Sequence, residues 1–367
     1  MLNFKSNYPI GIDISSRNIY AVQLKKTRQG FAVRALAHRE IETEIDSSPD
    51  ANPGLVYAVK KMTKNRNFRG KSAVLHIPVK NLSVLPIRFQ VGKTETLEEA
   101  ILRESEKYLS FPLEEAAIDY PSLTPDVNGD GNAYRATVIA VQRKYIEQYL
   151  QLMKKAGLVV DVVDYRVSSL IRLHKHFYKV TQHPVILCNI GYFGSMLAVV
   201  NEESILGQRY IPWGVHTLIE KILANLELLD SKDNAKLLLK THGLAYDDLK
   251  SADSADDSLP DATMVNMRRA IFQVITPSID ELVFEFQKMI SGVMSEQQHT
   301  AFEGMYMYGH AALIHHLDRY FERRLSIPTR GINPMTMVAL SGGNKFSDID
   351  EGAPFALALG LAMREIK

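Results

Sequence analysis

Two similar strand–turn–strand patterns, at residues 10–24 and 186–200, constrain the fold of this chain more than any other feature of its sequence. In each pattern, apolar residues alternate with small or polar ones, which is typical of a strand with one buried face. Asn189 in the second pattern corresponds to Asp13 in the first. A related hairpin at the start of each half predicts two related lobes. Two unrelated hairpins are the alternative.

The composition agrees with two lobes. The chain has 367 residues, more than the roughly 250–300 at which a single core stops growing.

Its 43 basic and 42 acidic residues leave a formal charge of +1, which argues against a protein that binds nucleic acid non-specifically. Cys188 is the one cysteine, which excludes a disulfide framework and a cysteine zinc site. Since no apolar run approaches ~18 residues and no signal segment is present, we expect a cytoplasmic protein.

Hydrophobic periodicity predicts a mixed α/β protein. Besides the two hairpins, strands are expected over residues 71–78, 82–89, 116–123, 134–142, 159–164 and 304–308. Helices are expected over residues 97–111, capped by the turn at 94–97, and over 145–156, 167–177, 217–229, 234–242, 277–293, 313–325 and 355–365. The polar, acidic segment 250–263 is expected to be an exposed loop.

Four stretches of the chain resemble the PilM family of type IV pilus assembly proteins, within the actin-like ATPase superfamily. They are residues 11–16 (GIDISS), 104–115 (ESEKYLSFPLEE) with the Asp119-Tyr120 pair behind it, 140–164, and 356–362. The second stretch is the most specific, because PilM proteins show a similar E-x-E-x-Y-x-x-F-P-L run ahead of an acidic strand. The resemblance covers nearly the whole chain. It implies an α/β, actin-like two-lobe fold with duplicated RNase H-like domains and an FtsA-like inserted subdomain.

The family fold implies a division of the chain. Residues 1–183 would form the first lobe, with the inserted subdomain at about 84–152. Residues 184–340 would form the second lobe, with a helical subdomain at about 215–277, and residues 341–367 would return to the first lobe.

The resemblance also implies a nucleotide cleft between the lobes. In this fold, hairpin turns offer backbone N–H groups to phosphates, and acidic side chains at strand ends hold Mg²⁺. The positions that match are Asp13, Ser15, Ser16, Asp164, Asn189, Gly191, Gly194, Ser195 and Gly309. The resemblance therefore makes Mg·ATP the candidate cofactor.

Several of these positions depart from the family pattern. Asn189 replaces an aspartate and brings no charge to a metal ion. Tyr192 and Phe193 are bulky for a phosphate-binding turn, and His310 and Ala311 replace glycines in a turn beside the base. The base-clasping helix, at residues 235–239, lacks the acids and the lysine of its relatives. We therefore expect no ATP hydrolysis, weak or absent ATP binding, no catalytic residues and no metal site.

The partner that the resemblance implies is a PilN-like bitopic membrane protein. Its short cytoplasmic tail would dock in a groove between the core of the first lobe and the insert, lined by Val84, Leu85, Ile87, Tyr108, Phe111 and Pro112. Further implied partners are other inner-membrane platform proteins, the assembly ATPase and copies of this chain in a ring, but no nucleic acid. The protein would then be a cytoplasmic scaffold that is peripheral to the inner membrane.

Other interpretations are open. The main alternative is an active ATPase or phosphotransferase of the actin and sugar-kinase superfold, although Asn189 and the missing sugar-binding cluster speak against it. A filament former like FtsA would need an amphipathic anchor at the C-terminus. Residues 126–131 resemble the start of a calcium loop, but Thr137 stands at the position of the bidentate glutamate, so a hairpin turn is favoured.

Overall fold

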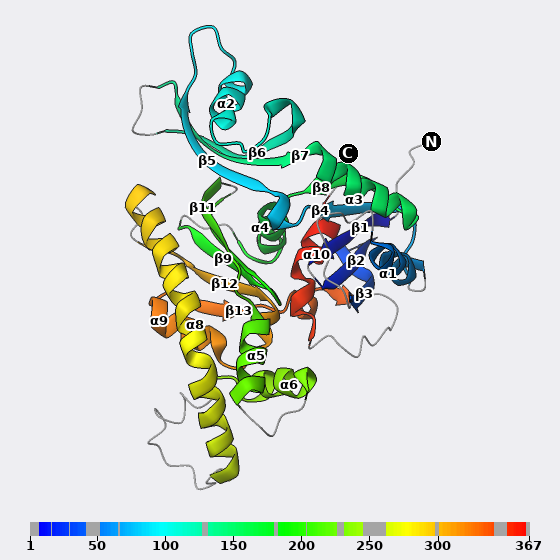
Figure 1. The fold of residues 1–367 in the computed structure, drawn as a ribbon, viewed down its shortest axis with the longest axis vertical. Helices are drawn as coiled ribbons and strands as arrows, with labels where there is room; N and C mark the ends of the chain where they lie inside the picture. Colours follow the sequence, from blue (N-terminus) through cyan, green and yellow to red (C-terminus); the bar gives the residue numbers. More distant parts are fainter. Residues whose placement is uncertain are drawn as a thin grey trace.

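The computed structural model describes residues 7–15, 17–28, 30–41, 52–64, 67–126, 131–179, 183–202, 204–225, 231–244, 262–297, 301–340 and 351–364. These residues form three sheets with helices between and around them (Figure 1). Ser16 and residues 127–130 of the turn compared with a calcium loop lie outside the described residues, as does most of the expected loop at 250–263.

A six-stranded mixed sheet forms the centre of the first lobe. Its strand order is β14-β3-β2-β1-β4-β8, with bounds β1 (Asn7–Ile14), β2 (Asn18–Thr27), β3 (Gly30–Glu40), β4 (Ser72–His76), β8 (Val159–Asp164) and β14 (Ala339–Leu340). The first hairpin continues into β3, so β1, β2 and β3 form an antiparallel meander. Strands β4 and β8 add in parallel beside β1, and their carboxyl ends therefore meet at the edge where the β1–β2 turn lies.

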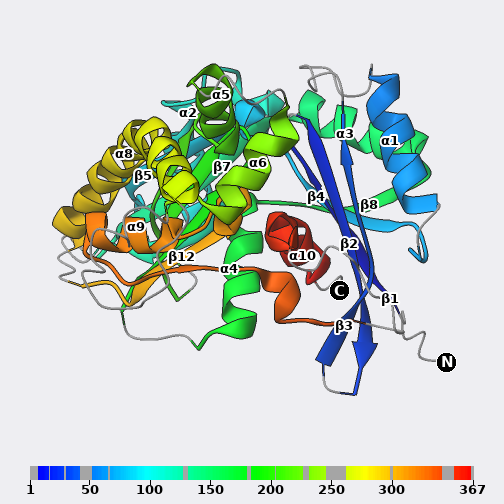
Figure 2. The ribbon, with the colours of Figure 1, turned by 90° about the horizontal axis from the view of Figure 1, so that it is seen from below.

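Helices cover both faces of this sheet (Figure 2). Helices α1 (Pro53–Lys64) and α3 (Arg143–Lys155) share one core with the outer face. Helices α4 (Arg166–Phe177) and α10 (Ala356–Ala362) lie on the inner face, in a core that also contains residues of the second sheet. The backbone of α10 comes so close to β1 that a Cβ on Gly11 would lie 2.1 Å from the carbonyl oxygen of Ala358. The last helix thus packs against the first strand.

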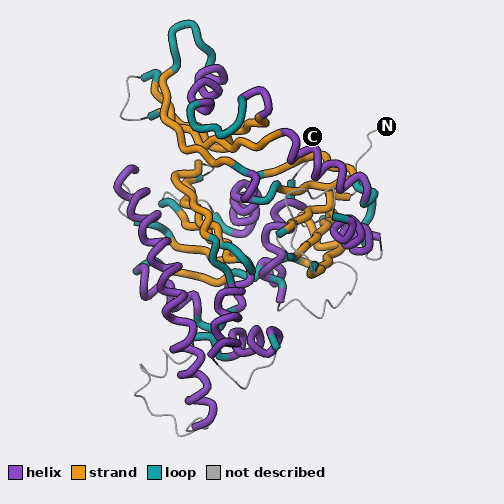
Figure 3. Tube along the Cα trace, in the orientation of Figure 1, coloured by secondary structure: helices purple, strands orange, loops and turns teal. Residues whose placement is uncertain are grey.

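The second lobe is built on a five-stranded sheet of order β11-β10-β9-β12-β13. Its strands are β9 (Val185–Ile190), β10 (Ser195–Asn201), β11 (Ser204–Ile211), β12 (Gly304–Gly309) and β13 (Thr329–Gly331). The expected second hairpin is thus present as β9 and β10, and β12 runs parallel to β9. The helices are α5 (Val215–Asn225), α6 (Lys232–Thr241), α8 (Ala262–Gln297) and α9 (Leu317–Leu325), shown in Figure 3.

Two helix boundaries in this lobe were predicted wrongly. Helix α8 begins at Ala262, not at Pro277, and continues through that proline. Proline favours the first turn of a helix, but buried Ile271, Ile275 and Ile279 follow one another at helical spacing across it, and packing outweighs the local preference. Helix α9 begins only at Leu317, because the first part of the segment expected at 313–325 is a left-handed turn at His316.

A three-stranded sheet of order β5-β7-β6 forms the insert. Its elements are β5 (Ser83–Gln90), α2 (Leu97–Glu106), β6 (Ala116–Pro125) and β7 (Ala133–Gln142). Helix α2 begins with a capping box between Thr96 and Glu99 and covers one face of this sheet. The insert also contacts the second lobe, where the Ile205 N–H donates a 3.1 Å hydrogen bond to the Ser122 hydroxyl. It therefore bridges the two lobes. The domain boundaries given above stay predictions.

Candidate functional site

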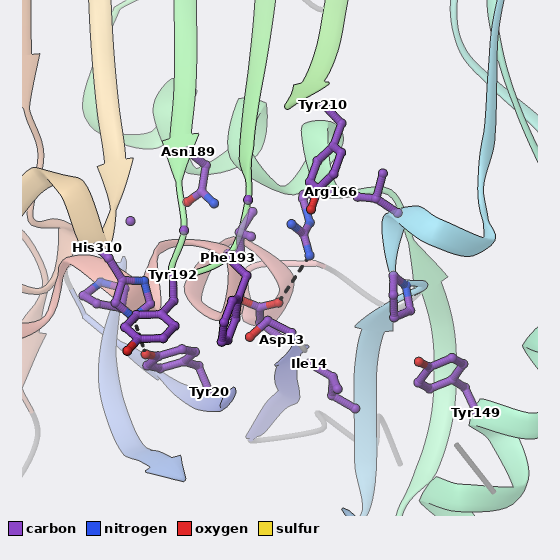
Figure 4. Close-up of a pocket in the computed structure, with 18 residues that line it drawn as sticks. Asp13, Ile14, Tyr20, Tyr149, Arg166, Asn189, Tyr192, Phe193, Tyr210 and His310 are labelled. Atoms are coloured by element: carbon purple, nitrogen blue, oxygen red, sulfur yellow. Dashed lines mark hydrogen bonds and ion pairs between the residues drawn. The ribbon is translucent and has the colours of Figure 1, made fainter. Parts of the chain in front are cut away.

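The two hairpin turns face one another across a cavity between the lobes (Figure 4). The cavity has a volume of about 120 Å³, below the ~300 Å³ at which small-molecule pockets begin. Six of the predicted nucleotide residues line it, namely Asp13, Ser15, Asn189, Gly191, Gly194 and Gly309. The structure thus gathers residues that are far apart in the sequence at the place where the family fold has its cleft.

Asp13, at the end of β1, is paired with other side chains of the protein itself. Its carboxylate forms a 2.6 Å hydrogen bond with His76 Nε2, and the Arg166 guanidinium lies 3.9 Å away. Burial alone would raise the pKa of Asp13, but His76 and Arg166 together hold that pKa below its ordinary value. The carboxylate is therefore ionised and already engaged at the position where the family fold would hold a metal ion.

Three other predicted residues are also engaged within the protein. Asp164 does not line the cavity; it pairs with Arg172 at 2.8 Å and with Arg364 at 3.5 Å. The Ser15 hydroxyl donates to the Asn18 carbonyl at 3.1 Å, within its own turn. Ser195 is fully buried and its hydroxyl donates to the Trp213 carbonyl at 2.6 Å. These side chains contribute to the hairpins and the core rather than to an open anion site.

Aromatic rings fill the side of the cavity where the resemblance places the base. The Tyr20 hydroxyl, from the first lobe, and His310 Nε2, from the second, are 2.8 Å apart and hydrogen-bonded. The ring of Tyr192 lies 5.7 Å from that of His310, and Phe355 packs edge-on against Tyr20. Burial lowers the pKa of His310 to about 3, so its imidazole is neutral at pH 7. The two lobes are thus joined here through uncharged side chains.

Tyr210 covers the second hairpin turn. A Cβ on Gly194 would lie 2.1 Å from the Tyr210 hydroxyl oxygen, so this hydroxyl touches the backbone that the resemblance assigns to phosphate binding. Figure 4 shows the ring of Tyr210 pointing from β11 into the cavity beside Arg166. The close approach that glycine permits is therefore made by a tyrosine of the same chain.

The sequence did not predict four residues of this site, namely His76, Arg166, Tyr20 and Tyr210. A signal for His76 was present, because the parallel neighbours β1 and β4 both end at this edge and place their last side chains together. Tyr20 and Tyr210 carry no such signal, since an aromatic residue in a strand is most often part of the core. His310 was expected to crowd the base, and the structure places it in the cavity.

The six residues expected to line the partner groove differ in their exposure. Tyr108, just after α2, has 59% of its surface exposed, and Pro112 is exposed as well. Val84, Leu85 and Phe111 are half-buried. Ile87 is 3% exposed and packs in the core between α2 and its sheet, so it offers no surface to a partner.

Comparison with known proteins decides the family. A family model described as type IV pilus assembly protein PilM matches residues 11–250. The chain belongs to the PilM family. A solved PilM–PilN type IV pilus biogenesis complex contains a chain with 22% identity and a TM-score of 0.75, and the match covers 97% of this chain and 98% of that one.

The PilM fold also resembles more distant proteins. The ethanolamine utilization protein EutJ from Carboxydothermus hydrogenoformans matches with 13% identity and a TM-score of 0.54, over 97% of this chain and 89% of that one. The expected actin-like two-lobe α/β fold is confirmed. Within the described residues, no helix has both the length and the apolar character to cross a bilayer.

Proposed function

We propose that this chain is a scaffold protein of a type IV pilus assembly machine that binds the cytoplasmic tail of a PilN-like membrane protein. The observation that carries the proposal is the PilM family match over residues 11–250. The fold it shares with a chain of a PilM–PilN complex supports the same partner. Through that tail, the protein would be held at the inner membrane beside other platform proteins and the assembly ATPase, as a ring of copies.

The edge of the insert sheet offers a place for an extended tail. Within the described part of the chain, β5 pairs on one side only, with β7. Its other side leaves backbone N–H and C=O groups for an added strand, which is a common way of binding peptides. Exposed Pro86 on β5 agrees with an edge position. Tyr108 stands exposed on the same subdomain and could cover a docked tail.

Unsatisfied polar atoms lie on the elements that join the insert to the lobe. Asn81 ends a short 3₁₀ turn two residues before β5, and Gln148 and Tyr149 lie on α3, which follows β7. Asn81 Nδ2, Gln148 Oε1 and the Tyr149 hydroxyl are buried and have no hydrogen-bond partner among the described residues. A buried polar group without a partner costs about 1–3 kcal/mol. These groups are sealed within the junction between the insert and the lobe, and Tyr149 also borders the interlobe cavity, so the proposed docking rests on the free edge of β5.

We further propose that the ancestral nucleotide site is not used. Mg·ATP would have to displace the His76–Asp13 pair, the Tyr20–His310 bond and the Tyr210 hydroxyl together. The residues present do not fit that cofactor, because Asp13 is already paired and the remaining cavity of about 120 Å³ is too small. Nucleotide-independent scaffolding is thus the interpretation that these contacts support.

The test is the affinity of the purified protein for a fluorescent synthetic peptide with the sequence of the PilN-like protein's cytoplasmic tail. We expect saturable binding, weakened roughly tenfold by Tyr108→Ala, because an aromatic anchor in an interface is commonly worth more than about 1 kcal/mol. Tyr57→Ala is the matched control, since Tyr57 is 58% exposed and lies on α1. No binding by the wild type, or equal loss in both variants, would refute the proposed docking.

A further inference from the structure

The outer layer of the first lobe carries a concentration of positive charge that the peptide site does not use. Helices α1 and α3 contain seven basic residues and one acid, Glu147. The whole chain is almost neutral, with 43 basic and 42 acidic residues, so the two helices are strongly basic against a balanced background. They pack side by side over one face of the six-stranded sheet, as Figures 1 and 2 show.

On α1 the charges form one stripe. Leu55, Ala58, Val59 and Met62 are buried against the sheet. Tyr57, Lys60, Lys61 and Lys64 repeat at the same helical spacing on the opposite face and are exposed. The Lys61 ammonium and the Arg39 guanidinium each lie 5.7 Å from the centre of the Tyr57 ring. The exposed stripe is thus an aromatic ring surrounded by cations.

Helix α3 extends this surface. Its buried residues Tyr149, Leu152 and Met153 face the same core. Arg143, Lys144, Lys154 and Lys155 are exposed. Of the basic residues on both helices, Lys60, Lys64, Arg143, Lys144 and Lys154 form no ion pair with any described residue. The charge of this surface is therefore largely uncompensated in the described part of the molecule.

The same surface exposes one large apolar side chain on each of three elements. These are Tyr57 on α1, Leu150 on α3 and Val159 at the start of β8. A protein interface is usually depleted in lysine and centred on an apolar patch. Many lysines around a few separate apolar side chains suit a bilayer of anionic lipids instead, because the lysines meet the headgroups while tyrosine and leucine enter the interfacial layer.

We propose that the exposed surface of α1 and α3, called the α1–α3 face, binds directly to the surface of an anionic membrane. This face is defined by Tyr57, Lys60, Lys61, Lys64, Arg143, Lys144, Leu150, Lys154, Lys155 and Val159. This contact needs no protein partner. It would add to any attachment through a bitopic protein. When one contact holds the protein at the membrane, the effective concentration for forming the second contact is higher. It would also fix the orientation of the first lobe relative to the bilayer.

The experiment is co-sedimentation of the purified full chain with protein-free vesicles of phosphatidylcholine that contain 30% or no phosphatidylglycerol. We expect binding to the anionic vesicles only, and its loss in 0.5 M salt, since surface charges are screened there. Each lysine near an anionic surface contributes about fivefold to the partition coefficient, so Lys60→Gln, Lys61→Gln and Lys64→Gln together should lower it roughly 100-fold. Replacing the same three lysines with glutamate should lower the partition coefficient further.

The control combines Lys93→Gln, Lys179→Gln and Lys221→Gln, three exposed lysines outside α1 and α3. This variant should bind like the wild type. The proposal is overturned if the wild type binds neutral and anionic vesicles equally, or if the control loses as much binding as the α1 variant. It is also overturned if the face instead joins copies of the chain, which would appear as salt-sensitive self-association lost in the α1 variant without vesicle binding. Tail-peptide affinity, measured without lipid, should be the same in all variants, so the two proposals can fail separately.

Discussion

Tyr20 and His310 lie 290 positions apart in the sequence, yet their side chains meet in a 2.8 Å hydrogen bond that joins the two lobes across the cavity. Tyr20 is buried on β2 of the first lobe, and His310 follows β12 of the second. Burial raises the pKa of Tyr20 and lowers that of His310, so both groups are uncharged at neutral pH. The cavity edge is therefore closed by side chains of the protein itself.

This closure predicts the outcome of a nucleotide titration. Calorimetry of the wild type with Mg·ATP should show no binding at concentrations up to about 1 mM, which corresponds to less than about 4 kcal/mol of binding free energy. The physical reason is that Asp13, Tyr20 and Tyr210 are already engaged where the ligand would lie. A micromolar dissociation constant, or sustained ATP turnover by the purified chain, would restore the ATPase interpretation.

The contribution of the lobe-to-lobe bond can be measured with Tyr20→Phe. This change removes the hydroxyl and leaves His310 Nε2 without its partner, so the free energy of unfolding should fall by about 1–2 kcal/mol in urea denaturation. Tyr57→Phe is the control, because the exposed Tyr57 should change stability by no more than about 0.5 kcal/mol. Equal effects would mean that the Tyr20–His310 bond adds nothing to stability.

Asp13→Asn distinguishes a structural aspartate from a metal ligand. The carboxylate of Asp13 is buried beside His76 and Arg166, so the neutral amide should lower the free energy of unfolding at pH 7 by about 3 kcal/mol. If Asp13 served only to hold a metal ion, the same substitution would raise the free energy of unfolding in metal-free buffer, because it removes a buried charge. Asp233→Asn is the control; the Asp233 side chain is 91% exposed, so this change should cost less than about 1 kcal/mol.

His310 should make stability depend on pH. Its pKa is about 3 in the folded protein, because of burial, and about 6.5 in an unfolded chain. Between these values only the unfolded chain binds the proton, so the unfolding free energy falls as the pH drops below 6.5. From pH 7 to pH 5 the wild type should lose about 1–2 kcal/mol more than His310→Gln, a range that allows for the part of the ring that borders the cavity. The free energy of unfolding is measured by urea denaturation at both pH values. An equal loss in the wild type and in His310→Gln would show that His310 is not shielded as described.

The contact between the last helix and the first strand predicts a severe effect of one methyl group. In Gly11→Ala the new Cβ would lie 2.1 Å from the Ala358 carbonyl oxygen and 2.4 Å from the Ala362 nitrogen, both backbone atoms that cannot move alone. We expect a loss of at least about 4 kcal/mol, measured by thermal unfolding or by the yield of soluble protein. Gly292→Ala on α8 meets nothing within 4 Å and should gain about 0.5–1 kcal/mol.

The elements that could be predicted are those whose pattern is local. Alternating apolar residues identified both hairpins, β1–β2 and β9–β10, and the motif at 104–115 was specific enough to identify the family. The start of α8 was missed, because the rule that proline opens helices is also local, and burial of Ile271 and Ile275 in the tertiary core outweighed it.

Local patterns along the chain were enough to establish the hairpins and the family, and they pointed to six of the eighteen residues that line the interlobe cavity. What those residues contact became known only from the packing of the folded chain. His76 meets Asp13 across 63 positions and His310 meets Tyr20 across 290, and no short pattern encodes such distances. The reason is physical: periodicity reports which face of an element is buried, whereas a hydrogen-bond partner is set by how two separately formed sheets and their helices pack together.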